Sequence, residues 1–428
     1  MKMIFLIRRL LSAAFVASLL LSCTGAMASQ QKVEQVLSGN IFSDTDKKFT
    51  AIVVDKHRET LYVVEVQDNV PVVTRSFRII AGKNEGDKVK EGDNKTPEGI
   101  YFIKGSISPG KLNSILFGDG AYTLNYPNIV DKNRGKTGHG IWIHGRGKDR
   151  NDDRTKGCVS LNNNDLEALK TYISIDTPVV ISRSLEYLKS EEYKKKKRKY
   201  SEYFKGFITA WEKGDFEDFA NYFDNRFREV GGLPNRAYLQ KKKKLMRKYS
   251  ERKVVASDVV IFTENSTEML YKFNQLYCAN NVLSFGVKKL YLTADKSDDY
   301  KIIAEEFEKG DPGPYVRQQV EAFLSKWKNN WRARDLEKYA GFYSTDFYSD
   351  NMNLKQWKAH KKSHFSSARN IKLEISDLSV TIVSPMMLRV AFKQHYSSGA
   401  VSDTGLKTMV LTGCPGSYKI KEEHWQAL

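Results

Sequence analysis

The second half of the chain is an internal repeat, and this feature constrains its fold most strongly. Shifted by about 119 residues, the sequence aligns with itself from Ala210 onward. The aligned positions are mostly aromatic: Trp211 with Trp331, Asp215 with Asp335, Phe223 with Tyr343, Phe227 with Phe347, and Tyr277 with Tyr396. Each copy has a helical opening followed by strands over about 110 residues, the size of one α+β domain. We therefore expect two tandem α+β domains, repeat 1 (206–310) and repeat 2 (315–428).

The region before the repeats is expected to form a mainly β domain at residues 45–183. From Phe49 the sequence alternates between apolar and polar residues with the period of two that is typical of strands. Several glycines and Pro97 then mark loops before another short strand. The charged segment 184–205 contains no Gly or Pro, and it is predicted to be a helical linker into repeat 1.

The N-terminus up to Ala28 is typical of an export signal. Three basic residues precede an apolar run at 10–21, and small residues follow at Ala26 and Ala28. The run is about 12 residues long, shorter than the roughly 20 that span a bilayer. Cleavage after Ala28 would release a soluble protein, whereas the residues before Cys23 also fit a lipoprotein signal. We expect the protein in the periplasm or cell envelope, and at a membrane only if Cys23 is lipidated.

The chain is basic, because 69 Lys and Arg against 51 Asp and Glu give a formal net charge of +18. A basic protein attracts anionic partners. The lysine-rich runs at 194–199 and 241–244 fit the solvated faces of helices, with attraction to an anionic envelope polymer as the alternative. Since we expect export, nucleic acid is not expected as a partner.

The cysteine count bears on both pairing and chemistry. Three of the four cysteines remain if Cys23 leaves with the leader, so at least one stays unpaired within the chain. Cys278 and Cys414 fit either small buried hydrophobic residues or a disulfide pair. Cys158 lies in a polar segment and does not look like a core residue.

Cys158 follows His144 by fourteen residues, and the two suggest a nucleophile and its base. A thiol with a pKa of about 8.5 is mostly protonated at neutral pH, so a nucleophilic cysteine needs a nearby base. His144, at the end of an apolar strand, is the candidate. Gly157 would let the backbone bend closely around a substrate carbonyl, where main-chain N–H groups would stabilise an oxyanion.

Three sequence elements surround this pair in order: a GD-x-x-TP-x-G-x-Y stretch, an HG pair and a T-x-G-C core. Their residues are Gly92, Asp93, Thr96, Pro97, Gly99, Tyr101, His144, Gly145, Thr155, Gly157 and Cys158. Together they resemble the catalytic domain of the YkuD-type L,D-transpeptidases, over roughly 49–183. The resemblance implies a mainly β, YkuD-like β-sandwich that requires no cofactor.

The resemblance also implies a reaction on peptidoglycan stem peptides. Cys158 would attack the carbonyl on the L-centre of the third stem residue, D-alanine at position four would leave, and a thioester would remain. His144 would be the base, and Gly157 with Cys158 would form the backbone neighbourhood of the oxyanion. An acceptor amine would then give a crosslink or an anchored protein, as in a transpeptidase. Water would give a trimmed tripeptide, as in an L,D-carboxypeptidase.

Two positions depart from the commonest family pattern. Lys156 stands where SHGC has its second His, and Ser160 stands where an Arg or Asn is common. The first change suggests that His144 alone serves as base. The second removes a polar side chain that would hold the substrate, and the guanidinium group of an arginine, which suits a carboxylate, would replace it. The expected substrate-binding residues are Gly145, Arg146, Arg154, Thr155, Lys156 and Ser160, with Arg150 as a further hypothetical clamp. If the altered motif has lost activity, the chain would be a wall-binding scaffold.

Both repeats open on W-x3-D followed by a pair of aromatic residues, and both end in a Y-K-I strand. These patterns resemble the nuclear-transport-factor-2-like (NTF2-like) fold, a cone of helices against a curved sheet. The resemblance implies modules that bind a protein partner or form a homodimer. The aromatic residues of the pattern are most simply core residues: Trp211, Tyr222, Trp331 and Phe342. A T-K-G-C core followed by a C-terminal NTF2-like module resembles the L,D-carboxypeptidases that set helical cell shape in some Gram-negative bacteria. In this chain the module is doubled.

No metal site is expected. His139 lies five positions before His144, which would place it on the opposite face of a strand and outside the catalytic pair. A zinc site of His139, His144, Asp152 and Cys158 matches none of the usual ligand spacings. The glycine-rich stretch near Gly82 lacks the G-K-[ST] ending of a phosphate loop.

Overall fold

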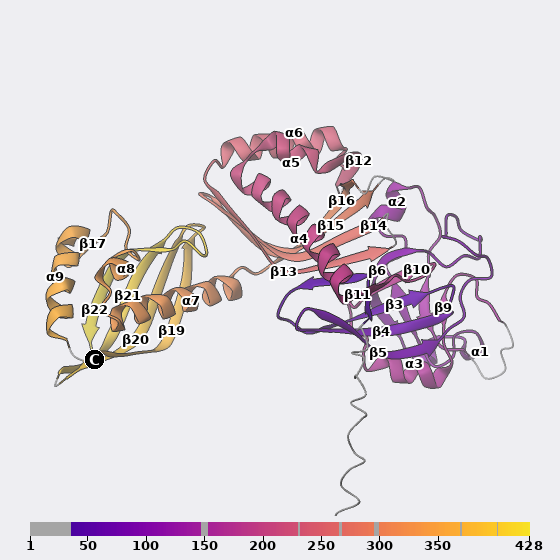
Figure 1. Ribbon diagram of the computed structural model, residues 1–428, viewed down its shortest axis with the longest axis horizontal. Coiled ribbons are helices and arrows are strands. Elements are labelled where there is room, and N and C mark those ends of the chain that lie inside the picture. The colour runs from indigo at the N-terminus through magenta and orange to yellow at the C-terminus, as the bar shows by residue number, and fades with distance from the viewer. Residues whose placement is uncertain are drawn as a thin grey trace, which may run out of the picture. The chain divides into compact units, whose positions relative to one another are not determined.

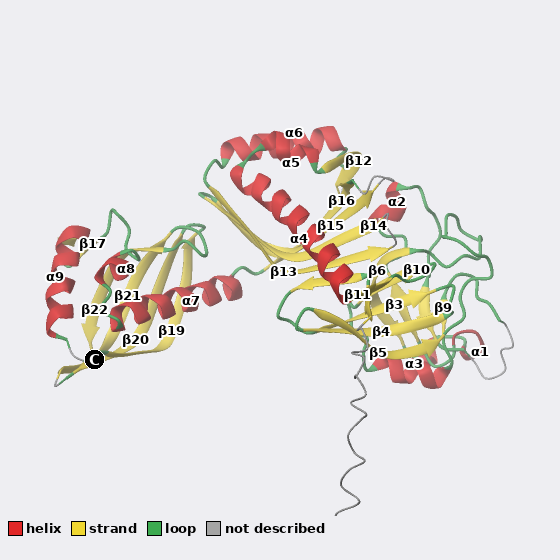
Figure 2. Cartoon of the chain, viewed as in Figure 1, coloured by secondary structure: helices red, strands yellow, loops and turns green. Residues whose placement is uncertain are grey.

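The structure is a computed structural model, and it describes residues 36–146, 153–229, 232–264, 268–294, 299–368, 370–399 and 401–428. The expected export signal with Cys23 lies outside these residues, as do Arg150 and Asp152. Strands make up most of the regular structure, with helices packed against them (Figure 2). Within the described residues, no helix is long and apolar enough to cross a membrane.

An eight-stranded sheet forms the N-terminal domain, in the spatial order β5-β4-β3-β10-β6-β7-β8-β9. Its strands are β3 (Phe49–Asp55), β4 (Thr60–Gln67), β5 (Val70–Arg78), β6 (Gly99–Ile107), β7 (Ala121–Leu124), β8 (Trp142–His144), β9 (Val159–Ser160) and β10 (Pro178–Ser182). The last strand, β10, is central, parallel to β3 and antiparallel to β6. The two ends of the domain therefore pair in mid-sheet, and β8 and β9 lie at one edge.

Both faces of this sheet are buried, which explains the nearly continuous apolar runs of its central strands. One face packs on α3 (Asn163–Lys170), with Ile52 and Val179 against Leu169. The opposite face carries Val53 and Phe102, and it shares a core with Phe262, Leu270 and Tyr291 of repeat 1. Short helices η1 (Pro109–Lys111), α1 (Ser114–Phe117) and α2 (Ile129–Asn133) lie in the loops.

Repeat 1 is a cone of three helices against a curved sheet (Figure 1). The helices are α4 (Ser190–Lys213), α5 (Phe216–Asn221) and α6 (Asn235–Lys248); the strands are β12 (Phe223–Glu229), β13 (Arg252–Glu264), β14 (Glu268–Ala279), β15 (Val282–Ala294) and β16 (Tyr300–Gly310). Trp211 is buried between α4 and the sheet, near Phe219 and Tyr277. This places it in the core.

A strand from the N-terminal region completes the sheet of repeat 1. β2 (Ile41–Asp44), which follows β1 (Val36–Ser38), pairs antiparallel with β13, and Phe42 lies opposite Ile261. The sheet order is β12-β16-β15-β14-β13-β2. The Phe42 ring is fully buried and packs on Tyr193 and Tyr200 of α4. The sequence did not predict that a segment before residue 45 belongs to this sheet.

The charged segment 184–205, predicted to be helical throughout, is helical only from Ser190, and from there it forms one helix with the opening of repeat 1. After β11 (Tyr187–Lys189), α4 runs without interruption to Lys213 and ends at Gly214, whose φ of 75° suits glycine. Tyr193, Tyr200 and Phe204 point into the core, whereas most of the 194–199 run is exposed. The helix is thus amphipathic over its whole length.

Repeat 2 has the same architecture. Its elements are α7 (Gly313–Arg332), α8 (Leu336–Ala340), β17 (Tyr348–Ser349), β18 (Met352–Asn353), α9 (Leu354–Ser367), β19 (Lys372–Ser384), β20 (Met387–Ser398), β21 (Val401–Thr412) and β22 (Lys419–Ala427). Trp331 is buried against Tyr339, as Trp211 is against Phe219. The duplication extends to buried charges: Lys288 lies 2.6 Å from Glu305, and Lys407 lies 2.9 Å from Glu423.

A disulfide joins the two repeats. Cys278 on β14 is bonded to Cys414, which follows β21, across a sequence separation of 136 residues. The structure therefore shows the pair that the sequence left open as an alternative for these two cysteines. Cys158 takes part in no disulfide and is half-buried.

Candidate active site

Strand pairing brings His144 and Cys158 to one edge of the sheet. β8 ends at His144, β9 begins directly after Cys158, and the two strands are parallel, with His144 opposite Ser160. Side chains two residues apart on a strand share a face. His144 and Ser160 therefore share a face, and Cys158 directly precedes this pair of strands, although a polar loop separates it from His144 in the sequence.

The orientation of the imidazole is set by the main chain. His144 is buried, and its Nδ1 lies 2.5 Å from the carbonyl oxygen of Gly145. A carbonyl only accepts, so Nδ1 carries the proton and Nε2 has the basic lone pair. Ser160 Oγ donates to the same carbonyl at 3.4 Å, and the Gly145 N–H donates to the carbonyl of Gly120. This arrangement suits a histidine that takes a proton at Nε2.

Thr155 holds the loop that carries Cys158. Its buried hydroxyl donates to the Cys158 carbonyl at 2.7 Å and accepts the Gly157 N–H at 3.0 Å. The Thr155 backbone bonds to Ala81 and Lys83, in the segment after β5. The Cys158 Sγ lies 3.5 Å from the carbonyl oxygen of Gly140. The thiol is thus presented by a short turn anchored at both ends.

Gly157 is required by geometry. Its φ is +133°, and a Cβ built there would lie 2.8 Å from the carbonyl oxygen of Lys95. No side chain fits at this position without displacing backbone. The Gly157 N–H is bonded to the Thr155 hydroxyl; the expectation that the backbone around Gly157 and Cys158 stabilises an oxyanion stays a prediction.

The upstream motif builds the segment that packs against Gly157. Burial alone would raise the pKa of Asp93, but the Lys88 ammonium group at 2.7 Å and backbone N–H groups hold it well below its usual range. The Asp93 carboxylate accepts from the backbone of Val89, Lys90 and Lys95. The Asp93 side chain therefore holds a tight turn together through these backbone hydrogen bonds.

The six expected substrate-binding residues fall into two groups. Gly145, Thr155 and Ser160 are buried and contact His144 or the cysteine loop rather than solvent. The other three are at least partly exposed: Arg146, Arg154 and Lys156. Arg154 pairs with Glu59 beside a pocket of about 180 Å³. Only this second group is placed to meet a large substrate directly.

Other residues of the site carried no signal in the sequence. The ring of Phe117 meets His144 edge to face, with centroids 5.2 Å apart. Asn163 Oδ1 accepts the Asp119 N–H and would be only 2.3 Å from a Cβ on Gly145. Phe117 ends α1 and Asn163 begins α3, and neither belongs to a spaced motif.

His139 and the rejected zinc site can also be located. The His139 side chain is 84% exposed and lies 3.8 Å from Glu91. Among the residues that the structure describes, no group of three or more His, Cys, Asp or Glu could hold a metal ion. Asp152, one of the four imagined ligands, is outside those residues.

Comparison with known proteins shows which families the domains of this chain match. Residues 50–181 match the family described as L,D-transpeptidase catalytic domain (YkuD), and residues 200–306 and 319–424 each match the Cds6 C-terminal NTF2-like domain. The structure of Bd1075 from Bdellovibrio bacteriovorus is 30% identical, with a TM-score of 0.59, over 65% of this chain and 99% of that one. The chain belongs to the YkuD L,D-transpeptidase family.

Two further structures of the same kind are similar to this L,D-transpeptidase family member. Both are of the helical cell shape determining protein Pgp2 from Campylobacter jejuni, one of them a point mutant. They are 28% and 27% identical, with TM-scores of 0.53 and 0.52, and cover 63% of this chain and 94% and 95% of theirs. No curated protein matches the chain. The mainly β catalytic domain and the two NTF2-like repeats predicted from the sequence are confirmed.

Proposed function

We propose that the protein is a cysteine acyltransferase that acts on the stem peptides of peptidoglycan. Cys158 is the nucleophile and His144 is its base. The observation that supports this most directly is the Nδ1 contact of His144 with the Gly145 carbonyl, on a strand paired with the one that follows Cys158. Because Nδ1 donates to that carbonyl, Nε2 is the basic nitrogen that can take the thiol proton.

The reaction begins with transfer of the Cys158 thiol proton to Nε2 of His144. The thiolate attacks the carbonyl carbon of the third stem residue, and the tetrahedral intermediate collapses as the amide C–N bond breaks. The imidazolium of His144 gives its proton to the departing nitrogen, so D-alanine leaves with a neutral amine rather than as an amide anion. A thioester on Cys158 and a neutral His144 remain.

Resolution of the thioester repeats these roles. His144 removes a proton from an acceptor amine or from water, the acceptor attacks the thioester, and the thiol is regenerated. An amine acceptor gives a crosslink, as in transpeptidation; water gives a tripeptide, as in L,D-carboxypeptidase trimming. Arg146, Arg154 and Lys156 are the exposed cations beside the site that would bind carboxylates of the stem.

The test is incubation of the purified protein with disaccharide tetrapeptide, with and without an acceptor stem, followed by mass spectrometry. We expect release of D-alanine, with the tripeptide or a crosslinked dimer as the second product. Cys158→Ala should abolish both, and His144→Ala should slow labelling of Cys158 by a carbapenem. A folded Cys158→Ala protein that still releases D-alanine would refute the assignment. No change in the stem by the parent protein would instead support a wall-binding scaffold.

We also propose that the protein works in the periplasm or cell envelope, where peptidoglycan is found. The leader-like N-terminal sequence supports this. The similarity to the helical cell shape determining protein Pgp2 supports a role in cell shape. Fractionation of cells that make the tagged full-length chain would test the location, and cytoplasmic recovery of the mature protein would contradict it.

A further inference from the structure

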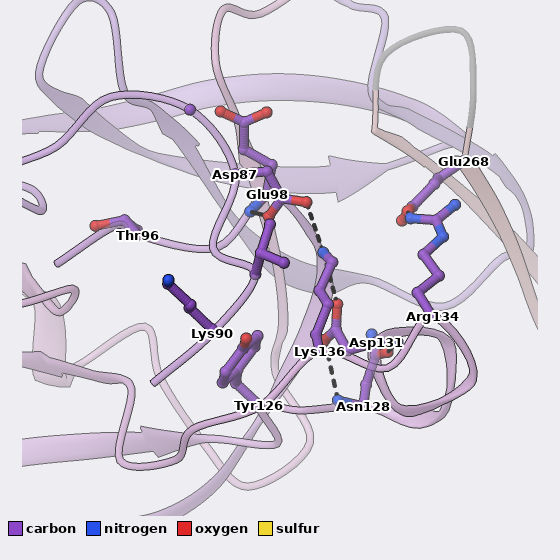
Figure 3. A network of polar contacts seen from close by, with 12 residues as sticks. Asp87, Lys90, Thr96, Glu98, Tyr126, Asn128, Asp131, Arg134, Lys136 and Glu268 are labelled. Atoms are coloured by element: carbon purple, nitrogen blue, oxygen red, sulfur yellow. Dashed lines mark hydrogen bonds and ion pairs between the residues drawn. The ribbon is translucent and has the colours of Figure 1, made fainter. Parts of the chain in front are cut away.

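A buried polar network connects repeat 1 to the segment that supports the cysteine loop (Figure 3). We propose that Lys136 is a positioning residue for Cys158, because its ammonium group holds the segment 82–98 in the place where that segment supports the cysteine loop. This inference deepens the proposed function: it assigns repeat 1 a part in shaping the active site.

The network begins on repeat 1. Glu268, at the start of β14, is buried and forms an ion pair with Arg134, the residue at the C-terminal end of α2 (Figure 3). A second contact is close by, where the Asn133 side chain donates to the carbonyl of Ile303 on β16. Both contacts hold α2, a helix of the catalytic domain, against the sheet of repeat 1.

Lys136 continues the network from α2. Asp131 lies inside this helix, where it closes a capping box with Asn128, and its carboxylate is 2.9 Å from Lys136 Nζ. The same Nζ is 2.6 Å from a carboxylate oxygen of Asp87 (Figure 3). The Lys136 side chain is only 6% exposed and lies between two anions. Burial alone would lower its pKa, but Asp131 and Asp87 raise it above its ordinary value.

Asp87 lies within segment 82–98 and links Lys136 to the rest of that segment. Asp87 Oδ1 accepts the N–H of Glu98 at 2.9 Å. The Glu98 side chain pairs with Lys56 at 2.9 Å, and Lys56 Nζ also donates to the carbonyls of Gly86 and Thr96. These bonds tie both ends of the 82–98 segment together.

The segment then meets the cysteine loop at two points. Thr96 Oγ1 accepts the N–H of Gly82, which forms a bridge with Thr155, the residue whose hydroxyl holds the Cys158 carbonyl. The Lys95 carbonyl closes the space above Gly157. Contacts therefore run from Glu268 of repeat 1 to the backbone of the proposed nucleophile.

The charge of Lys136 balances two carboxylates at once. Removing Lys136 would leave Asp131 buried with no cation beside it, which is strongly unfavourable. The Asp131 carboxyl, whose pKa is already raised by burial, would then take up a proton or move toward water. In both cases the ionic contact that fixes Asp87 is lost and segment 82–98 shifts, and displacement of reacting groups by about 1 Å costs up to about 100-fold in rate.

The first test is Lys136→Met, which keeps the length of the side chain and removes its charge. We expect kcat for D-alanine release to fall by about 10- to 100-fold, with a smaller change in KM, because the reacting groups rather than the substrate contacts move. Hydrogen exchange of the amides of 82–98 should accelerate. Lys136→Arg should recover part of the rate, since it restores a cation.

Two measurements do not depend on turnover. One is the rate at which iodoacetamide alkylates Cys158 in the folded protein, read by mass spectrometry; the other is hydrogen exchange of 82–98. Both should change in Lys136→Met. If the parent protein releases no D-alanine, the proposed function fails, yet these measurements still decide the role of Lys136. A folded Lys136→Met protein with the parent's alkylation rate and exchange pattern overturns the inference.

Matched variants separate this effect from general loss of charge. Lys104→Met removes a lysine that is also 2.7 Å from a carboxylate, Asp176, but on the surface of the same domain; it should behave as the parent. Glu268→Gln should accelerate exchange of 82–98, as the link to repeat 1 predicts, and unchanged exchange would contradict that link. If Lys136→Met does not fold, Asp87→Asn is measured instead, with the same expected changes in alkylation and exchange. This variant weakens the contact between Lys136 and segment 82–98 but leaves Lys136 paired with Asp131.

Discussion

At the scale of residues, the proposed nucleophile and base depend on groups that are mostly backbone. The Gly145 carbonyl orients His144, and the Thr155 hydroxyl binds both the Gly157 N–H and the Cys158 carbonyl. This explains why small or short residues recur here. A longer side chain at Gly145 or Gly157 would occupy space already filled by Asn163 or by the Lys95 carbonyl.

Gly157→Ala tests this reading. The new methyl group would clash with the Lys95 carbonyl and force a backbone conformation that L-residues rarely adopt, so we expect a loss of about 1–3 kcal/mol in unfolding free energy. Acylation of Cys158 should also slow. Gly135→Ala is the control, because Gly135 has a φ of +73° with nothing near its Cβ; it should cost about 1 kcal/mol and leave acylation unchanged. Equal acylation rates in both variants would contradict the assigned geometry.

Glu264 predicts a pH dependence of stability. Burial, together with the charges of Glu268 and Glu98, raises its pKa from 4.5 to about 8. Between these values the folded chain binds a proton that the unfolded chain has lost, so the contribution of Glu264 is complete below pH 4.5 and is lost as pH rises to 8. The slope is about 1.4 kcal/mol per pH unit.

Glu264→Gln should remove this part of the pH dependence. Denaturant unfolding at about pH 5, 6.5 and 8 should show the variant gaining stability relative to the parent as pH rises. Glu167→Gln is the control, since that side chain is 73% exposed. A difference between parent and Glu264→Gln that stays constant with pH would show that the carboxyl ionises normally.

At the scale of elements, β2 is the unexpected piece. It belongs by sequence to the N-terminal region, yet it forms the edge of the repeat 1 sheet. The same edge is reinforced by Thr45 and Lys47, each 2.7 Å from Asp258 of β13. Because strand and catalytic domain are continuous in the chain, the catalytic domain and repeat 1 fold as a joined unit with a shared core.

Phe42→Ala should destabilise repeat 1, although the residue lies far from it in the sequence. The fully buried ring packs on Tyr193 and Tyr200, so its loss should cost about 3–5 kcal/mol, seen as a lower Tm. Phe307→Ala, at a position of repeat 1 that is 40% exposed, should cost less than about 1 kcal/mol. Similar costs for the two variants would mean that β2 does not pack there in solution.

At the scale of the whole molecule, the two repeats are copies joined by a covalent bond. The disulfide closes a span of 136 residues between Cys278 and Cys414, and both cysteines are buried beside Leu276. Crosslinking a loop of this size removes much entropy from the unfolded chain. The thiol of Cys158 stays out of this bond, as a nucleophile must.

The double variant Cys278→Ala/Cys414→Ala should lower the unfolding free energy by about 2–5 kcal/mol. D-alanine release should stay at the parent's rate below the melting transition, because the described neighbours of both cysteines belong to the two repeats. The check is calorimetry beside the muropeptide assay. Unfolding unchanged by the double substitution would show that the bond does not form in solution.

The sequence by itself determined the repeat and the β-rich domain before it, and it predicted the His144–Cys158 pair. Each is encoded in a continuous window: aromatic positions at fixed spacing, period-two alternation, or a short motif around one reactive residue. Such windows can be interpreted without knowing which distant segments meet. They also left open whether Cys278 and Cys414 pair, and they did not show what binds the Gly157 N–H.

Only the tertiary structure decided those points. The disulfide, the place of β2, the use of the Gly157 N–H by Thr155 and the Lys136 network all join segments remote in sequence. Their contacts depend on strand order and on which polar groups become buried together, because a buried donor or charge must find whatever partner the fold brings to it. That choice is made by the packed chain as a whole.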